Sequence, residues 1–389
     1  MPKNSSLAAN LEMGTATCSF RKSRDSHPRD SFLRSMDTQS EVVFRIPDTL
    51  MYWPWPRKIN PHHEEVKAAS DAWFRSLKAF GPEAQRVFER CDSSLLASLG
   101  CPTATKEHLR TVCDLMHLLF AFDDYTDNAP PEVVRQYADV VMDAIRNPIK
   151  SRPSDEVVLG VIAQEYSYSC LFWALGVKSA SGTSQKHFVE SLGHYVDALV
   201  QEAEDRHHRR IRNVEDYFDI RRWNIGIYMV HAMLELSYDM PDEVFNHPTV
   251  VALRSVGHDL MIMDNDLASY NKEQALEERP HNIIVCVMNE QNCDLHDALS
   301  WVENLYRSRR NKFLTLWSGI PSWEPEIDAI ASHYLHGIAN WVRGNECWNF
   351  ESERYFGSNG RAVQQHRMVT LMPKRLSASE PLLVHVQSL

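Results

Sequence analysis

The stretch that decides the fold is 115-LMHLLFAFDDYTDNAPP-131, where an apolar run leads directly into three aspartates and two prolines. From Leu109 into this stretch, apolar residues recur at spacings of three and four, which predicts an α-helix with one apolar face. That face consists of Leu109, Val112, Leu115, Met116, Leu119 and Phe120. Asp123 and Asp127 are four residues apart and share a face of that helix. Two carboxylates stacked there repel each other unless a divalent cation lies between them, and hard oxygen ligands suit Mg²⁺. An acidic last turn without a metal is the alternative, although the helix dipole disfavours it.

The helical spacing continues on both sides of this stretch, from about His63 to Phe356. Prolines and glycines interrupt it, and no strand-like alternation extends beyond a few residues. The 389 residues include only 14 Gly, which disfavours the sandwiches, barrels and Rossmann folds that use glycine at their turns. No internal repeat or linker divides the helical region. We therefore expect an all-α fold, with one helical domain over residues 43–357.

The two ends of the chain differ in composition from this domain. Residues 1–40 contain eight serines and few large apolar groups, so they bury too little surface to offset their ordering entropy. We expect residues 1–42 to form a disordered extension. The helical spacing is lost after Gly357, and we expect residues 358–389 to form a loosely ordered tail.

Charge and cysteine usage exclude several classes of protein. The chain has 41 basic and 52 acidic residues, a net charge of -11 that argues against general nucleic-acid binding. No apolar run reaches the roughly 18 residues of a membrane span, and the N-terminus lacks an apolar signal core. The eight cysteines show no CxxC pair, which is typical of reduced thiols in a cytoplasmic protein. No pattern specifies an oligomeric state.

A second apolar helix leads into polar oxygens at 264-DNDLASYNKE-273. Asn265, Ser269 and Glu273 follow one another at intervals of four, so an amide, a hydroxyl and a carboxylate form one column on a helix. Such a column can chelate Mg²⁺ and leave coordination sites for a phosphate group and water. Lys272 lies beside the column and can offer its ammonium group to phosphate oxygens. Either metal pattern is common by chance, but the two together are not.

Together, DDYTD at 123–127 and NDLASYNKE at 265–273 resemble the aspartate-rich and NSE motifs of class I terpene synthases. Two further segments match that family in order and spacing. DYFDIRRWNIG resembles its diphosphate-sensing segment, and ESERYFG resembles its C-terminal Arg-Tyr pair. The resemblance covers residues 43–357 and assigns substrate-binding roles to Arg222 as sensor, Gly226 as effector, Arg354 and Tyr355.

Membership of that family implies a helical bundle with a central active site, three Mg²⁺ ions and farnesyl diphosphate as substrate. Metals and basic groups would pull diphosphate away and leave an allylic cation, with Arg222, Lys272 and Arg354 stabilising the departing charge. By this resemblance Asp123 bridges two metals, while Asp127 contacts a metal or a basic side chain and Asp124 lies behind them. By the same resemblance, the third metal is bound by the column already described, namely Asn265, Ser269 and Glu273.

The resulting cation needs a cavity that is poor in water and lined by electron-rich rings. Phe120 lies three residues before Asp123, one turn deeper in the bundle. Trp341 and Trp348 precede Tyr355 by 14 and 7 residues and share a face with it if the helix is continuous. All three aromatics suit an ordinary core equally well, and Tyr195 and Met116 are weaker candidates for the cavity wall.

The stretch WPWPRKINPHHEEVKAASDAW at 53–73 resembles the Δ6-protoilludene synthase group of fungal sesquiterpene synthases. That resemblance implies ring closure between C1 and C11 of farnesyl diphosphate. A chain-elongating prenyl diphosphate synthase is the rival enzyme on this fold, but it carries two aspartate-rich motifs where this chain has Asn265, Ser269 and Glu273. A non-catalytic helical binding protein is the other alternative, and intact metal columns argue against it. The run 207-HHRR-210 with Arg212 is interpreted as a solvated helix face.

Overall fold

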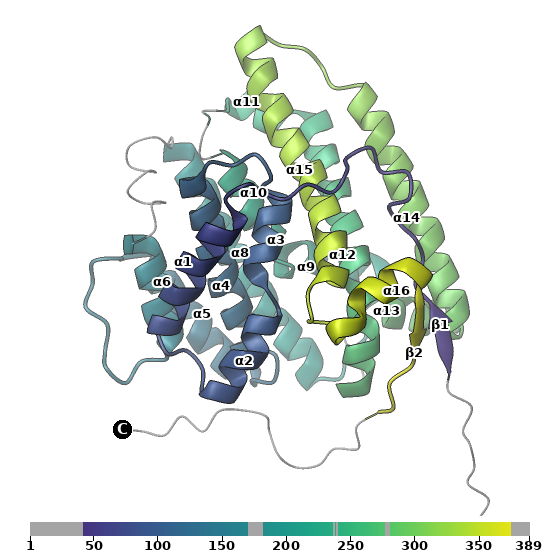
Figure 1. The fold of residues 1–389 in the computed structure, drawn as a ribbon, viewed down its shortest axis with the longest axis horizontal. Coiled ribbons are helices and arrows are strands. Elements are labelled where there is room, and N and C mark those ends of the chain that lie inside the picture. The colour runs from purple at the N-terminus through teal and green to yellow at the C-terminus, as the bar shows by residue number, and fades with distance from the viewer. Residues whose placement is uncertain (1–41, 170–181, 236–237, 239, 277–280, 375–389) are drawn as a thin grey trace, which may run out of the picture. The chain divides into compact units, whose positions relative to one another are not determined.

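The computed structural model describes residues 42–169, 182–235, 238, 240–276 and 281–374. Helices make up most of this part of the chain, which confirms the expected all-α fold (Figure 1). The first half contains α1 (His63–Ser76), α2 (Pro82–Arg90), α3 (Ser93–Gly100), α4 (Lys106–Thr126), α5 (Pro131–Arg146), α6 (Val158–Ser169) and α8 (Gly182–His207). The second half contains α9 (Val214–Asn224), α10 (Ile227–Glu235), α11 (Asp242–Phe245), α12 (Pro248–Leu276), α13 (Ile283–Gln291), α14 (Leu295–Ser318), α15 (Pro325–Glu351) and α16 (Gly360–His366).

Local sequence sets where these helices begin and end. The Thr105 side chain accepts a hydrogen bond from the His108 backbone N–H and caps α4. Proline stands at the start of α5 and α15, where its missing N–H costs nothing. Gly226, between α9 and α10, has φ +80°, a conformation that favours glycine and breaks the helix in two.

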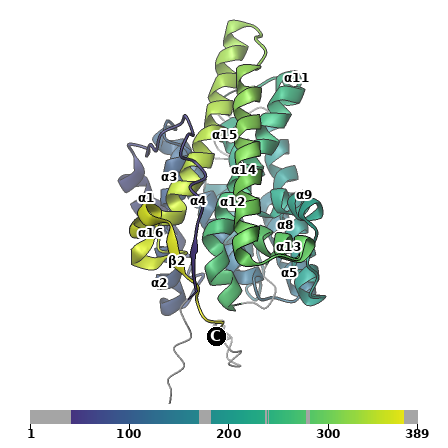
Figure 2. The ribbon, with the colours of Figure 1, turned by 90° about the vertical axis from the view of Figure 1, so that its right-hand side faces the viewer.

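The long helices pack side by side and enclose the core. Helix α12 packs against α14 and α15, and α3 packs against both α15 and α4. Helix α8 packs against α5, α9 and α10. The turned view in Figure 2 shows α12, α14 and α15 running alongside one another. The apolar faces of α4, α12 and α15 therefore meet in one continuous core.

Residues after Gly357 differ from the expected loose tail. A 3₁₀ turn, η1 (Gly357–Asn359), leads into α16, and β2 (Met368–Thr370) then pairs antiparallel with β1 (Val43–Arg45). Phe44 and Val369 face each other in that pair and are both buried. Residues 358–374 are thus part of the fold, anchored by a pairing too short to show as alternation. The proposed extension over 1–42 and the residues after 374 lie outside the described residues, except for Val42.

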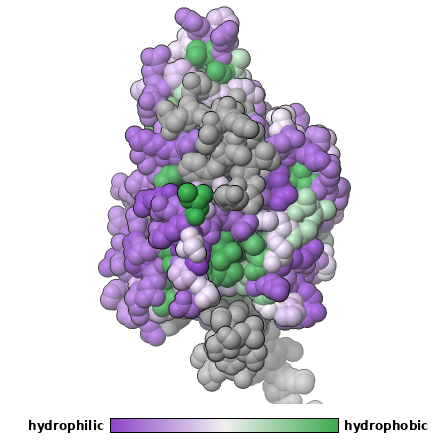
Figure 3. Space-filling model, turned by 90° about the vertical axis from the view of Figure 1, so that its left-hand side faces the viewer, coloured by the Kyte–Doolittle hydropathy of each residue, from purple (hydrophilic) through white to green (hydrophobic). Residues whose placement is uncertain are grey.

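The surface and the thiols fit the composition of the chain. On the face seen in Figure 3, hydrophilic side chains cover most of the described surface and apolar ones form small separate areas. No helix in the described part of the chain combines the length and apolarity needed to cross a bilayer, as expected. The six cysteines that the structure describes are free thiols, and all but Cys293 are buried.

Candidate active site

A cavity of about 460 Å³ lies among α3, α4, α8, α9, α10, α12 and α15. Apolar and aromatic side chains line one part of it, including Leu96, Met116, Leu119, Phe120, Trp341 and Trp348. Charged and polar side chains line another part, including Asp123, Asp127, Arg221, Asn265, Lys272, Glu273, Arg354 and Tyr355. A cavity of this kind suits a substrate with an apolar body and a charged end.

The last turn of α4 carries the three aspartates. Carboxylate oxygens of Asp123, Asp124 and Asp127 lie within 4.8 Å of one another. Burial raises the pKa of Asp124 to about 6. Asp127 is exposed, yet desolvation by the neighbouring protein and the charges of Asp123 and Asp124 raise its pKa well above the ordinary value. Clustered carboxylates that resist ionisation alone fit a divalent cation, whose charge removes their repulsion.

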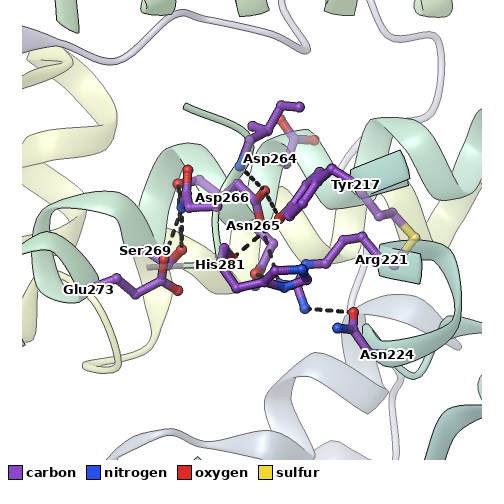
Figure 4. Close-up of polar contacts among 12 residues, drawn as sticks. Tyr217, Arg221, Asn224, Asp264, Asn265, Asp266, Ser269, Glu273 and His281 are labelled. Atoms are coloured by element: carbon purple, nitrogen blue, oxygen red, sulfur yellow. Dashed lines mark hydrogen bonds and ion pairs between the residues drawn. The ribbon is translucent and has the colours of Figure 1, made fainter. Parts of the chain in front are cut away.

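Helix α12 carries the second group of oxygens (Figure 4). Asn265 and Glu273 line the cavity, whereas Ser269 is buried beside them with 1% of its surface exposed. Asn282 Nδ2 donates to Glu273 Oε2 over 2.9 Å and to Ser269 Oγ over 3.4 Å, which holds the two side chains together. Burial raises the pKa of Glu273 to about 7. An amide, a hydroxyl and a buried carboxylate in one row again fit a hard divalent cation.

Asp266 supports this group of oxygens, and no motif in the sequence pointed to it. Its carboxylate is fully buried and accepts hydrogen bonds from the Tyr217 hydroxyl and from the Ile283 backbone N–H, the latter over 2.9 Å. Arg221 Nη2 lies 3.3 Å from its other oxygen. These contacts tie α12 to α9 and α13, so the position of Asn265 is fixed by its neighbour in the chain.

The arginine of α9 that faces the cavity is Arg221, and the structure places Arg222 away from the site that the resemblance assigned to it. Arg222 donates to Asp259 Oδ1 over 2.7 Å and to Asp219 Oδ1 over 3.0 Å. Arg221 lines the cavity and donates from Nη2 to Asn265 Oδ1 over 2.9 Å. Adjacent residues point about 100° apart around a helix, so a shift of one residue decides which guanidinium enters the site.

Arg354 and Tyr355 reach the cavity from the turn that follows α15. Arg354 Nη2 donates to Asp123 Oδ2 over 3.1 Å, and Tyr355 accepts a 2.9 Å hydrogen bond from Asn265 Nδ2. The pair therefore contacts both groups of oxygens, Asp123 on α4 and Asn265 on α12. Lys272 also lines the cavity, and burial and the nearby Arg354 lower its pKa. Gly226 lines the cavity at the break between α9 and α10.

Phe120, Trp348 and Tyr355 meet at one wall of the cavity. The Phe120 and Trp348 rings are 5.5 Å apart, and the Trp348 and Tyr355 rings are 5.8 Å apart, both edge to face. Helix α15 ends at Glu351, so the continuous helix considered for Tyr355 does not exist, and the following turn brings its ring back to Trp348. Trp341 lies so close to α3 that a Cβ at Gly100 would be 2.4 Å from its ring.

The weaker candidates and several unpredicted residues also line the cavity. Met116 and Tyr195 both do so. Residues 207–210 are exposed, as the interpretation of this run as a solvated face expected, and Arg209, Arg210 and Arg212 also line the cavity. Helix α8 ends at His207, and the loop after it carries them. Residues that belong to no motif in the sequence also line the cavity, among them Glu202, Arg206 and His281.

The fold and the site define a class: an all-α protein whose cavity holds two groups of oxygens suited to divalent cations, guanidinium groups beside them and an aromatic wall. Residues 114–312 match the family model described as "Terpene synthase family 2, C-terminal metal binding". The chain belongs to this family of terpene synthases, as the resemblance predicted. It is therefore a terpene cyclase that uses a divalent metal ion.

Relatives and solved structures agree with this assignment. The chain is 48% identical to a Δ6-protoilludene synthase of Stereum hirsutum, over 92% of this chain and 96% of that protein. It is 46% identical to sesquiterpene synthase 14 of Postia placenta, over 87% and 95% of the two chains. The crystal structure of germacradien-4-ol synthase from Streptomyces citricolor is similar in fold, with a TM-score of 0.65 and 22% identity over 76% of this chain and 96% of that one.

Proposed function

We propose that this enzyme ionises all-trans farnesyl diphosphate with three Mg²⁺ ions, closes a ring between C1 and C11, and releases diphosphate and a tricyclic hydrocarbon of the Δ6-protoilludene type. One observation carries the proposal. Oxygen-bearing side chains at the end of α4 and on α12 line the same cavity as the aromatic wall: Asp123, Asp127, Asn265 and Glu273. That arrangement supplies a charged end for a diphosphate and a water-poor end for its hydrocarbon chain.

At the charged end, the metal ligands proposed are Asp123, Asp127, Asn265, Ser269 and Glu273. Mg²⁺ held there would neutralise the charge that develops on the leaving diphosphate. Arg221, Lys272 and Arg354 lie around the same part of the cavity and would bind diphosphate oxygens directly. Tyr355 would add a hydroxyl donor to the same oxygens. Arg222 is not part of this proposal, because Asp259 and Asp219 hold its guanidinium.

At the other end, the cavity wall protects a carbocation from water. Phe120, Trp341 and Trp348 present ring faces or edges to the cavity, and such rings stabilise a nearby cation by about 0.5–2 kcal/mol each. Trp341 and Trp348 are each only 1% exposed, so bulk water is excluded around them. These residues shape how the hydrocarbon chain folds before ring closure.

Closure between C1 and C11 is supported by the relatives. Several of them carry the name Δ6-protoilludene synthase, at 43% to 48% identity over most of this chain. This closure needs the all-trans chain folded with its distal double bond over C1 at the moment of ionisation. No isomerisation of the first double bond is required.

One experiment distinguishes this proposal from its alternatives. Purified enzyme is supplied with Mg²⁺ and farnesyl diphosphate, with and without isopentenyl diphosphate, and inorganic diphosphate and organic products are measured. A cyclase releases diphosphate and a fifteen-carbon hydrocarbon whether or not isopentenyl diphosphate is present. A chain-elongating enzyme yields a longer diphosphate only when it is present, and a binding protein yields neither, so either result would overturn the proposal.

A further inference from the structure

Helix α8 carries two cavity-lining side chains that have no place in the reaction described above. Glu202 and Arg206 are four residues apart and share one face of the helix. Arg206 Nη2 donates to two backbone carbonyls, Thr126 O over 3.0 Å and Ala129 O over 3.2 Å. These carbonyls lie at the C-terminal end of α4 and in the turn behind it, next to Asp127.

The end of α4 is an unfavourable place for aspartates. The last carbonyls of a helix lack partners within the helix, and this end carries the negative side of the helix dipole. Asp123, Asp124 and Asp127 add negative charge at the same end. The Arg206 guanidinium donates to the Thr126 carbonyl at the helix end and to the Ala129 carbonyl in the turn after it, and it places a positive charge beside the acidic turn. It therefore fixes that turn before any metal binds.

Glu202, one turn earlier on the same face of α8, makes the corresponding contact with α9. Asn224 Nδ2 donates to Glu202 Oε2 over 2.5 Å, and Asn224 Oδ1 accepts from Arg221 Nη1 over 3.1 Å. Arg221 in turn donates to Asn265 Oδ1 over 2.9 Å. Figure 4 shows three side chains of this series: Asn224, Arg221 and Asn265. Hydrogen bonds thus run from Glu202 to a metal-ligand residue.

We propose that Glu202 and Arg206 are positioning residues, which use α8 to hold the aspartate turn of α4 and the oxygen column of α12 at the separation that metal binding requires. We call these contacts the α8 brace: Arg206 with the Thr126 and Ala129 carbonyls, and Glu202 with Asn224, Arg221 and Asn265, the two sets being joined by one turn of α8. The brace connects the two metal-ligand groups through protein alone. It rests on the proposed function, because it assumes that both groups bind metal together with diphosphate.

The test measures metal binding without turnover. Thermal unfolding is followed with fixed inorganic diphosphate and increasing Mg²⁺, and the Mg²⁺ concentration that gives half of the stabilisation is recorded. We expect this concentration to rise about tenfold in Arg206→Ala and in Glu202→Ala, the size typical of residues that orient metal ligands. Glu202→Gln retains an acceptor oxygen for Asn224 and should stay within about twofold of the wild type.

Two further variants separate positioning from general stability. Arg135→Gln removes an ion pair of 2.7 Å between α5 and Asp197 of α8, on residues that do not line the cavity. Its Mg²⁺ requirement should be unchanged. The double variant Arg206→Ala with Glu202→Ala should shift the requirement by less than the product of the two single shifts, because both act through one connected series. If the alanine variant of Arg206 does not fold, Arg206→Met replaces it, since methionine keeps an extended side chain but has no donor for the Thr126 and Ala129 carbonyls.

The outcomes decide between the brace and other roles. A wild-type Mg²⁺ requirement in Arg206→Ala or Arg206→Met, with only a lowered melting temperature, would overturn the brace. A Glu202→Gln variant as impaired as Glu202→Ala would also overturn it, because the carboxylate charge would then matter rather than the hydrogen bond. Wild-type enzyme that is stabilised by Mg²⁺ and diphosphate but releases none from farnesyl diphosphate overturns the proposed function and leaves the brace standing.

Discussion

Arg354 and Asp123 form an ion pair across the cavity, with Nη2 3.1 Å from Oδ2. One residue follows α15 near the end of the described chain, and the other lies in the last turn of α4. The Arg354 side chain is only 13% exposed, and its guanidinium also lies over the Phe120 ring at 4.9 Å. This pair therefore joins the acidic turn, the aromatic wall and the basic side of the cavity. Metal binding to Asp123 would leave Arg354 available to a diphosphate.

Removing either metal-ligand group should abolish catalysis. In Asp123→Asn and Asn265→Ala, we expect diphosphate release from farnesyl diphosphate to fall by at least about 100-fold, because charge on the leaving group is no longer neutralised. Circular dichroism should remain helical in both variants. Asp219→Asn is a matched control, since Asp219 is an α9 carboxylate whose side chain is 70% exposed and pairs with Arg222. Near-wild-type turnover in both ligand variants would contradict the assignment.

Arg354 should bind diphosphate only when metal is present. Mg²⁺ with inorganic diphosphate should raise the melting temperature of the wild type, because the complex binds the folded state alone. Arg354→Ala should lose most of that rise, and Arg354→Lys should keep part of it, since lysine retains the charge without the bidentate fork. Equal stabilisation by diphosphate in the presence of a chelator would show that the binding is independent of metal.

The two adjacent arginines of α9 should behave differently. Arg221→Ala removes a side chain that lines the cavity and contacts Asn265, so we expect the rate of diphosphate release to fall by about 100-fold. Arg222→Ala leaves Asp259 without one of its two arginine partners, the other being Arg309. It should lower the melting temperature while kcat stays within about threefold of the wild type. A larger loss of kcat in Arg222→Ala than in Arg221→Ala would reverse this assignment.

Regular spacing explains which parts of the site could be predicted from the sequence. Asp123 and Asp127, and the column from Asn265 to Glu273, are set by the period of a single helix, so their shared faces follow from residue numbers alone. Arg221 and Arg222 could not be separated in this way. Each follows an aromatic residue by four positions, Tyr217 or Phe218, and both of these aromatics are buried. Only the packing of α9 against α12 decides which arginine enters the cavity.

The remaining differences arise from contacts between distant parts of the chain. Arg206 donates hydrogen bonds to the backbone carbonyls of Thr126 and Ala129. A pattern of side chains in the sequence does not indicate such contacts. The β1–β2 pair joins residues near 44 and 369 in strands of three residues each, too short for alternation to be recognised. Tyr355 reaches Trp348 through a turn and not through a continuous helix. Tertiary packing decides each of these features.

A buried histidine pair predicts acid sensitivity. His258 and His231 share a 3.0 Å hydrogen bond between Nε2 and Nδ1, and both are fully buried. Burial lowers the pKa of His231 to about 3, and burial together with His231 and Arg254 lowers that of His258 well below 6.5. Because the unfolded chain binds these protons first, stability that is present above about pH 6.5 is lost as the pH falls below it.

The histidine contribution can be measured as a slope. Each neutral buried histidine adds up to about 1.4 kcal/mol per pH unit to the dependence of the unfolding free energy below pH 6.5. His231→Gln should therefore show a shallower fall in unfolding free energy between about pH 6 and pH 4 than the wild type, whatever its stability at neutral pH. Urea unfolding at several pH values gives both slopes. Identical slopes would mean that the pair does not govern acid sensitivity.

The central claim is tested most directly by the product of purified enzyme with Mg²⁺ and all-trans farnesyl diphosphate, identified by gas chromatography and mass spectrometry. We predict one main tricyclic hydrocarbon of the Δ6-protoilludene type, formed with release of an equal amount of inorganic diphosphate and abolished by a chelator. A main product with a cadinane, cuprenene or other bisabolyl-derived skeleton would contradict closure between C1 and C11. Absence of both hydrocarbon and diphosphate would contradict the cyclase itself.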